Sequence, residues 1–157
     1  MLNDDINKAK LDRALHECNM HELRLKDVNE IIQGLFPLDL ENYKNLSKMN
    51  VMALDQFIYR FTKLQDSMGM HLFSAVLIFL KEDIRTLSFI DILNKLEKLE
   101  IIESKDQWLE LRAVRNQFAH EYGDDKKNIS VLNQLVKKQS ILINVFEKIK
   151  EYIKSKR

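Results

Sequence analysis

The sequence predicts an all-α protein, an up-down helical bundle of four main helices plus a shorter one. Three observations lead to this prediction. The 157 residues include only three glycines and one proline, so few positions interrupt a helix. Apolar residues recur at helical spacing along most of the chain, and no stretch shows the alternation of a strand. Hydrophobic residues make up 45% and charged residues 31%, which is typical of helix-rich globular proteins rather than disordered ones.

The length is that of one domain, so we expect residues 1–157 to form a single helical domain. A single cysteine, Cys18, excludes an internal disulfide and is typical of a reducing compartment. The longest apolar run, residues 72–80, is too short to span a bilayer. Residues 1–5 lack the basic and apolar segments of a signal peptide. We therefore expect a cytoplasmic protein with no membrane partner.

The first half of the chain predicts two long helices joined by a short one. An amphipathic pattern over residues 5–35 ends at Pro37, which cannot continue a helix. Asp39 then caps a short helical turn. A second long helix is expected over residues 49–80, and its strongly apolar face makes it central to the bundle. Its predicted core positions are Val51, Leu54, Phe57, Ile58, Phe61, Leu64, Met68, Leu72, Ala75, Val76 and Phe79.

The second half predicts three further helices. Ser88 and Asp91 form a capping box that starts a third helix, which extends to about residue 101. Ser104 begins a fourth helix, expected over residues 105–122 and ended by Gly123. Residues 123–128 are expected to form a polar turn. A fifth helix then runs from about residue 129 into a lysine-rich end, where cations suit a helix C-terminus.

The end of the fourth predicted helix carries polar residues in an unusual arrangement. Arg115 and Tyr122 are seven residues apart, so they fall on nearly the same line as the apolar Leu111 and Phe118. A cation is therefore expected within a stripe that faces the core. An unpaired buried charge costs several kcal/mol, so a helical adaptor that carries these residues by coincidence is disfavoured.

Asn116 and His120 are four residues apart and lie one above the other on this helix. Arg115 and His120 are instead separated by about 140° around the helix axis. Two arrangements would bring both side chains onto one ligand. Either the long arginine reaches along the helix, or a second copy of the helix supplies the partner group.

Residues 115–122 read R-N-Q-F-A-H-E-Y, which contains the pattern R-N-x-x-x-H-x-Y. This pattern resembles the signature of the HEPN superfamily, specifically the HepT-like toxins encoded beside minimal nucleotidyltransferase antitoxins in type VII toxin–antitoxin pairs. The resemblance covers the motif closely and the rest of the chain only through its helical layout. It implies a homodimer that forms through the motif-bearing helix, with both motifs in one cleft.

The residue types suit metal-independent cleavage of RNA. RNA supplies its own nucleophile, the 2′-OH, so the protein needs a proton acceptor, a proton donor and charge stabilisation at the phosphate. Histidine, here His120, can exchange protons near neutral pH, and the planar guanidinium of Arg115 can bind two phosphate oxygens in a bidentate manner. Asn116 is placed to orient the imidazole or a phosphate. The resemblance implies the same catalytic roles, so we predict an endoribonuclease with no metal and no cofactor.

Tyr122 has two interpretations. It is either an aromatic residue that closes this face of the helix or a site of modification. The resemblance implies the second, because in HepT-like toxins the cognate nucleotidyltransferase attaches AMP to the tyrosine of this motif. Added phosphate charge beside Arg115 and His120 would occupy the guanidinium and block an RNA phosphate. The predicted partners are therefore RNA, a nucleotidyltransferase antitoxin and a second copy of the chain.

Four further residues are candidates for the cleft or for RNA contacts. Arg112 lies one turn before Arg115 and either widens the anion site or pairs with nearby carboxylates. Polar residues interrupt the second long helix, namely Arg60, Lys63, Gln65, Asp66 and His71. They form either an exposed polar face or a lining opposite Arg115, with Asp66 orienting the guanidinium through a charge-assisted hydrogen bond.

Charge is distributed unevenly along the chain. Nine Lys or Arg and four Asp or Glu follow residue 123, a local charge of +5, within a chain of net charge +1. This end would attract a polyanion, or is simply a solvated helix face. His16 and His21 are rotated apart on their helix, so no metal site is expected there. The alternative function is a noncatalytic HEPN-type module that binds a nucleotide or a partner protein.

Overall fold

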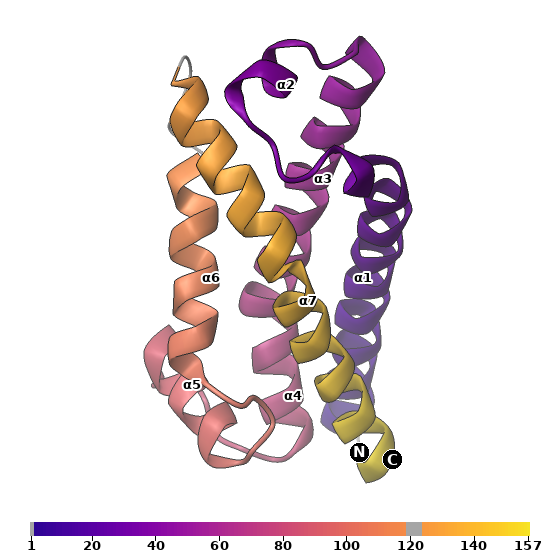
Figure 1. Ribbon diagram of the computed structural model, residues 1–157. Coiled ribbons are helices and arrows are strands. Elements are labelled where there is room, and N and C mark those ends of the chain that lie inside the picture. Colours follow the sequence, from indigo (N-terminus) through magenta and orange to yellow (C-terminus); the bar gives the residue numbers. More distant parts are fainter. Residues whose placement is uncertain (1, 119–123) are drawn as a thin grey trace.

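The computed structural model describes residues 2–118 and 124–157, whose regular secondary structure is entirely helical (Figure 1). This confirms the all-α prediction. The elements are α1 (Leu2–Ile32), the 3-10 turn η1 (Gln33–Leu35), α2 (Leu40–Lys44), α3 (Lys48–Ser67), the π turn η2 (Met68–Leu72), α4 (Phe73–Phe79), α5 (Phe89–Lys98), α6 (Lys105–Phe118) and α7 (Asp125–Lys156).

Side-chain caps begin α5 and α6 where the sequence predicts them. Ser88 accepts a hydrogen bond from the Asp91 amide at 3.2 Å, and Asp91 accepts one from the Ser88 amide at 3.1 Å, which completes the predicted capping box of α5. Ser104 Oγ accepts a hydrogen bond from the Gln107 amide at 3.1 Å at the start of α6. The start of α7 was predicted wrongly, because Asp124 caps the helix and α7 already begins at Asp125.

The predicted second long helix exists, but it is not a regular α-helix. A π turn, η2, separates α3 from α4 and adds an extra residue to one turn. Leu64, Met68, Leu72 and Val76 are fully buried although each is four residues from the next. An α-helix would rotate such a series steadily away from the core, and the wider π turn compensates. Val51, predicted as core, is 45% exposed in the first turn of α3.

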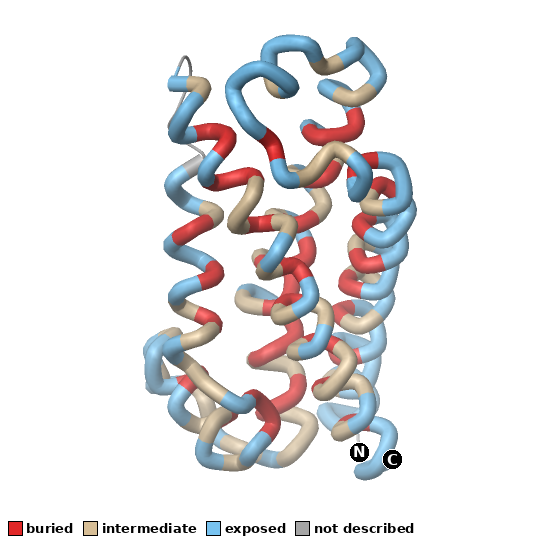
Figure 2. The backbone as a smooth tube through the Cα atoms, viewed as in Figure 1, coloured by how far each residue is buried: buried red, intermediate tan, exposed pale blue. Residues whose placement is uncertain are grey.

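The long helices pack around one apolar core. α1 lies along α3 and α4, α7 packs on α6 and also contacts α1, and α5 connects α4 to α6 at one end (Figure 1). Both chain ends lie at that same end of the molecule (Figure 1). Figure 2 shows buried residues recurring along the long helices, whereas α2 has none. The largest fully buried side chains include Phe57, Phe61, Phe73 and Phe146.

An asparagine connects the segment after α1 to α7. The amide of Leu38 donates to Asn133 Oδ1 at 2.9 Å, and Asn133 Nδ2 donates to the Leu38 carbonyl at 3.0 Å. One side chain therefore satisfies both backbone groups of a residue outside regular secondary structure. This contact holds the α1–α2 connection against α7.

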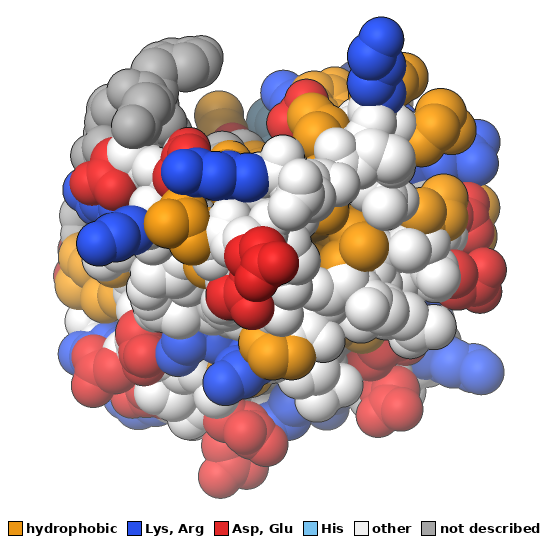
Figure 3. Space-filling model, turned by 45° about the horizontal axis from the view of Figure 1, so that its top comes forward, with side chains coloured by type: hydrophobic (Ala, Val, Ile, Leu, Met, Phe, Trp, Pro, Cys, Tyr) orange, Lys and Arg blue, Asp and Glu red, His pale blue; other side chains and the backbone are white. Residues whose placement is uncertain are grey.

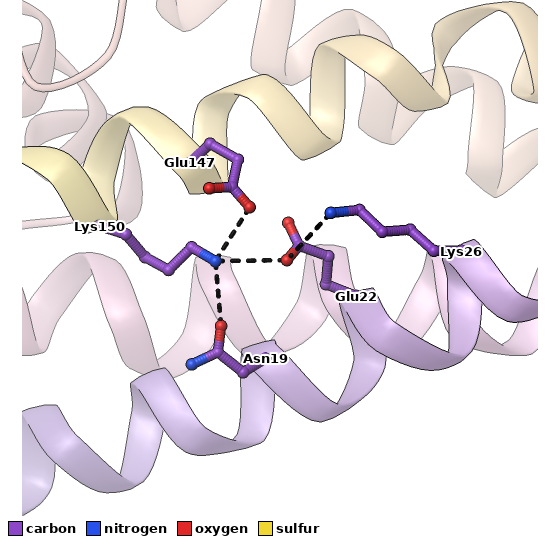
Figure 4. Close-up of polar contacts among 5 residues, drawn as sticks. All are labelled: Asn19, Glu22, Lys26, Glu147 and Lys150. Atoms are coloured by element: carbon purple, nitrogen blue, oxygen red, sulfur yellow. Dashed lines mark hydrogen bonds and ion pairs between the residues drawn. The ribbon is translucent and has the colours of Figure 1, made fainter.

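A polar cluster around the buried Glu22 joins α1 to α7 (Figure 4). Lys150 Nζ contacts oxygens of Glu147 at 2.9 Å, Asn19 at 3.1 Å and Glu22 at 3.3 Å, and Lys26 approaches Glu22 at 3.6 Å. Burial and a hydrogen bond with Glu147 raise the pKa of the Glu22 carboxyl. Glu22 is 6% exposed, so this carboxylate depends on the two lysines for compensation.

Apolar side chains are exposed at the end of the molecule formed by the last turn of α1, α2 and the first turns of α3. Figure 3 tilts this end toward the viewer and shows hydrophobic side chains between charged ones. The exposed residues there include Ile31, Leu40, Met49, Val51 and Met52. Among the residues described, no helix combines the length and the apolar character needed to cross a membrane.

Candidate functional site

The candidate site is centred on an ion pair between α6 and α3. Arg115 Nη1 donates to Asp66 Oδ1 at 2.7 Å. The Arg115 side chain is 12% exposed and that of Asp66 is 40% exposed, so the pair lies at the mouth of an interior space. This contact corresponds to one of the two interpretations that the sequence leaves open for Asp66, the one in which it orients Arg115. The carboxylate fixes one edge of the guanidinium and leaves its other N–H groups to point elsewhere.

Arg115 and Asp66 belong to the wall of a cavity of about 500 Å³. This volume is within the range of small-molecule sites, roughly 300–1,000 Å³. The cavity lies between the end of α3, η2 and the start of α4 on one side and α5 and α6 on the other. Its lining residues are Gln65, Asp66, Gly69, Met70, Ser74, Phe89, Ile92, Trp108, Arg112 and Arg115.

Aromatic rings form the apolar part of this wall. Trp108, which is 2% exposed, packs at a tilt against Phe73 with ring centroids 4.7 Å apart. The Arg112 guanidinium lies over the Phe89 ring at 5.4 Å from its centroid. A Cβ atom placed on Gly69 would lie 3.5 Å from Trp108 and 3.7 Å from Phe89. Glycine at this position therefore leaves both rings uncovered by a side chain.

Polar atoms without partners gather at the same cavity. Gln65 is 2% exposed, and its Oε1 and Nε2 atoms have no hydrogen-bond partner among the described residues. Arg115 Nε is likewise buried and unpartnered within the part of the chain that the structure describes. A buried polar group left unpaired costs about 1–3 kcal/mol. Three such atoms belong to residues that line this cavity, where a polar ligand or water could pair with them.

The structure brings together three of the predicted site residues, Asp66, Arg112 and Arg115. Asn116 is exposed on α6, one residue beyond Arg115 and outside the cavity wall. His120 and Tyr122 lie outside the described residues. Their predicted roles therefore stay predictions.

Arg60 and Lys63 do not line this cavity. Both cations lie near the Tyr59 ring, at 5.2 Å and 5.6 Å from its centroid. Arg60 Nη1 is 3.0 Å from His21 Nδ1, which accepts the hydrogen bond in the neutral form of the imidazole. Burial, and then the charge of Arg60, lower the pKa of His21 and favour that neutral form. These two cations therefore lie toward α1 rather than toward α6.

Sequence reasoning missed Phe89 and Trp108 as site residues, and it named Gln65 only among the polar residues that interrupt the second long helix. The position of Gln65 could have indicated a site residue. It lies four residues after Phe61 and three before Met68, within the apolar stripe of α3. An uncharged amide in a core stripe is a candidate for a specific hydrogen bond. The sequence gives no indication that Phe89 and Trp108 belong to a site, since an aromatic residue at helical spacing most often packs in a core.

Within residues 2–118 and 124–157, no three or more His, Cys, Asp or Glu side chains are grouped so that they could hold a metal ion. Comparison of the chain with protein-family models, with curated proteins and with solved structures gave no match.

Proposed function

We propose that this chain is a metal-independent endoribonuclease toxin of the HepT-like type, with Arg115 and His120 as its catalytic residues. The observation that carries the proposal is the Arg115–Asp66 ion pair at the mouth of a cavity that also contains Arg112. A guanidinium oriented by a carboxylate presents its remaining N–H groups in a fixed direction, as phosphate binding requires. The motif R-N-x-x-x-H-x-Y supplies the histidine.

The proposed reaction uses the ribose 2′-OH as the nucleophile. His120 accepts the 2′-OH proton while the 2′-oxygen forms a bond to phosphorus and the bond from phosphorus to the 5′-oxygen breaks. A second imidazole donates a proton to the departing 5′-oxygen. The products are a 2′,3′-cyclic phosphate and a 5′-hydroxyl. Arg115 stabilises the charge that develops on the phosphate oxygens, and Asn116 orients the imidazole or the phosphate.

The second imidazole comes from a second copy of the chain in this proposal. The helices form an up-down bundle in which α1, α3–α4, α6 and α7 are the main members, and two bundles meet through α6. A twofold axis beside α6 would place two arginines and two histidines in one groove. Activity should then follow the dimer fraction as protein is diluted. A fully active monomer in sedimentation and nuclease assays would contradict the dimeric site.

The proposed regulator is a minimal nucleotidyltransferase that transfers AMP to Tyr122. The adduct would add negative charge near Arg115, and that charge would compete with the RNA phosphate for the guanidinium. Intact-mass measurement of the toxin after incubation with its partner and ATP tests this step. The expected result is one AMP adduct, lost in Tyr122→Phe.

The function itself is tested by incubating the purified chain with total cellular RNA in EDTA. Wild type should produce fragments that end in 2′,3′-cyclic phosphate. His120→Ala and Arg115→Ala should lose roughly 10²–10⁴-fold in rate. Arg24→Ala is the matched control, because Arg24 is an exposed arginine on α1 in a surface pair with Asp27. If wild type carries no adduct on Tyr122 and still does not cut, the noncatalytic binding module replaces the nuclease.

A further inference from the structure

We infer that the cavity between α3, η2, α5 and α6 is a nucleobase pocket, in which Gln65 pairs with the edge of a base whose phosphate is held by Arg112 and Arg115. The inference deepens the proposed function, on which it rests for the claim that the bound nucleotide is part of an RNA substrate. Binding of a free nucleotide to the cavity can be measured whether or not the protein cuts RNA.

The charge of the wall selects an anion. The ionisable lining residues are two arginines and one aspartate, and the aspartate already pairs with Arg115. The Arg112 guanidinium lies 5.4 Å from the centroid of the Phe89 ring, on the exposed side of the cavity. A phosphate between the two arginines would receive charge-assisted hydrogen bonds, and those from Arg115, whose side chain is 12% exposed, would form in a largely desolvated place, where such bonds are strong.

The rest of the wall selects a flat apolar group beside that anion. Phe89, Trp108 and Ile92 line the cavity, and the absent side chain of Gly69 leaves space against both aromatic rings. Trp108 is 2% exposed and Ile92 is 9% exposed, so Phe89 offers most of the accessible apolar surface among these three residues. A free phosphate ion would leave the Phe89 ring uncovered, whereas a planar base would pack against it, as nucleobases do on aromatic side chains.

Gln65 identifies the ring as one with a hydrogen-bonding edge. A carboxamide carries one acceptor and one donor side by side, and the hydrogen-bonding edges of the nucleobases carry the complementary pair. Both polar atoms of Gln65 lack partners among the residues described, and the side chain is 2% exposed. A nucleobase would supply both partners after a rotation of the amide. A purely apolar ring would leave the amide unsatisfied, and a carboxylate would satisfy only its donor.

The π turn helps to make this cavity. Gly69 and Met70 lie within η2 and both line it. A π turn is wider than an α turn, and such turns occur frequently at functional sites. Gln65 and Asp66 lie on the turn before η2, four residues before Gly69 and Met70, and all four residues line the cavity.

The cavity contains its own reporter, because Trp108 is the only tryptophan of the chain. We would titrate the His120→Ala protein, which preserves the cavity residues, with each nucleoside 5′-monophosphate and with inorganic phosphate. Fluorescence would be excited where nucleotides absorb least, and calorimetry would give the Kd independently. At least one nucleotide should give a saturable change and bind at least tenfold more tightly than inorganic phosphate. Equal affinities, or no response to any nucleotide, would overturn the inference.

Two substitutions test the named residues. Gln65→Leu keeps the size of the side chain and removes both polar atoms, so nucleotide affinity should fall at least tenfold while phosphate affinity stays unchanged. Gly69→Leu should fill the space against the rings and abolish nucleotide binding. Gln134→Leu on α7 and Gly34→Leu, where an added Cβ meets nothing within 4 Å, are the matched controls. An unchanged affinity in Gln65→Leu would remove Gln65 from the site.

The two proposals fail separately. If wild type cuts RNA but no nucleotide binds the cavity, the pocket is wrong and the nuclease stands. If nucleotides bind through Gln65 but wild type free of any adduct on Tyr122 does not cut RNA, the pocket stands and the nuclease is wrong. In the first case Gln65→Leu should also leave cleavage unchanged, which gives an independent check.

Discussion

Arg115 Nη1 and Asp66 Oδ1 are 2.7 Å apart although the two residues are separated by 49 positions in the chain. This bond joins the last turn of α3 to α6 and holds a guanidinium that is 12% exposed. A hydrogen bond between charged groups contributes about 1.5–3 kcal/mol. Its larger effect is on direction, because the carboxylate decides where the other N–H groups of Arg115 point.

In the proposed ribonuclease reaction, Asp66→Asn should lower the rate of RNA cleavage about tenfold to a hundredfold. The amide keeps the shape of the carboxylate but forms a weaker hydrogen bond with Arg115. Each factor of ten in rate corresponds to about 1.4 kcal/mol of lost transition-state stabilisation. Single-turnover cleavage rates measure the effect. Asp55→Asn, at an exposed position of the same helix, is the control and should retain the wild-type rate. A wild-type rate in Asp66→Asn would show that Asp66 does not position Arg115 for the reaction.

Glu22→Gln should change how stability depends on pH. Burial and the hydrogen bond with Glu147 raise the folded-state pKa of Glu22 above its ordinary value of 4.5, so the folded state binds the proton more tightly than the unfolded state. The contribution of this carboxyl to stability is therefore greatest below pH 4.5 and falls as pH rises through the folded-state pKa. The charged groups that face it are Lys26, Glu147 and Lys150.

Urea unfolding of wild type and Glu22→Gln over pH 4 to 8 measures this effect. The free energy of unfolding of the variant, relative to wild type, should increase with pH, because glutamine has no proton to lose. Glu151→Gln, an exposed position on α7, is the control. A difference that is constant with pH would mean that Glu22 titrates alike in both states.

Cys18 should resist thiol reagents in the folded protein. The residue is fully buried, and burial, with the charges of Glu17 and Glu22, raises the pKa of the thiol from 9.0 to about 12. That rise lowers the reactive thiolate fraction about a thousandfold near pH 8. Labelling with DTNB should be slow in buffer and fast in denaturing urea. Rapid stoichiometric labelling of the folded protein would show that α1 opens readily at this position.

The sequence was most informative about where helices begin. Pro37, Asp39, Ser88 and Ser104 each mark a boundary through local chemistry, a missing N–H group or a side chain that caps an amide. Such signals depend on residues a few positions apart, so they can be read without a fold. The beginning of α7 was missed because the apolar pattern there starts at Ile129, five residues after the cap at Asp124.

The cavity could be predicted only in part. The Arg115–Asp66 contact was available from chemistry, since a cation in a core-facing stripe needs a carboxylate and the central helix offers one. The other walls come from segments up to 50 residues apart, and their meeting depends on how α5 and α6 pack against η2. No periodicity in the sequence encodes that packing.

The π turn at residues 68–72 has a consequence for comparing this chain with others. A helical wheel drawn at 100° per residue over 48–79 assumes one continuous α-helix. The extra residue in the π turn rotates α4 relative to α3, so one wheel cannot describe the faces of both helices. A related protein with an unbroken α-helix here would present equivalent faces only after a one-residue gap in the alignment. Placing that gap within residues 68–72 would align Gln65 and Val76 with their structural counterparts at the same time.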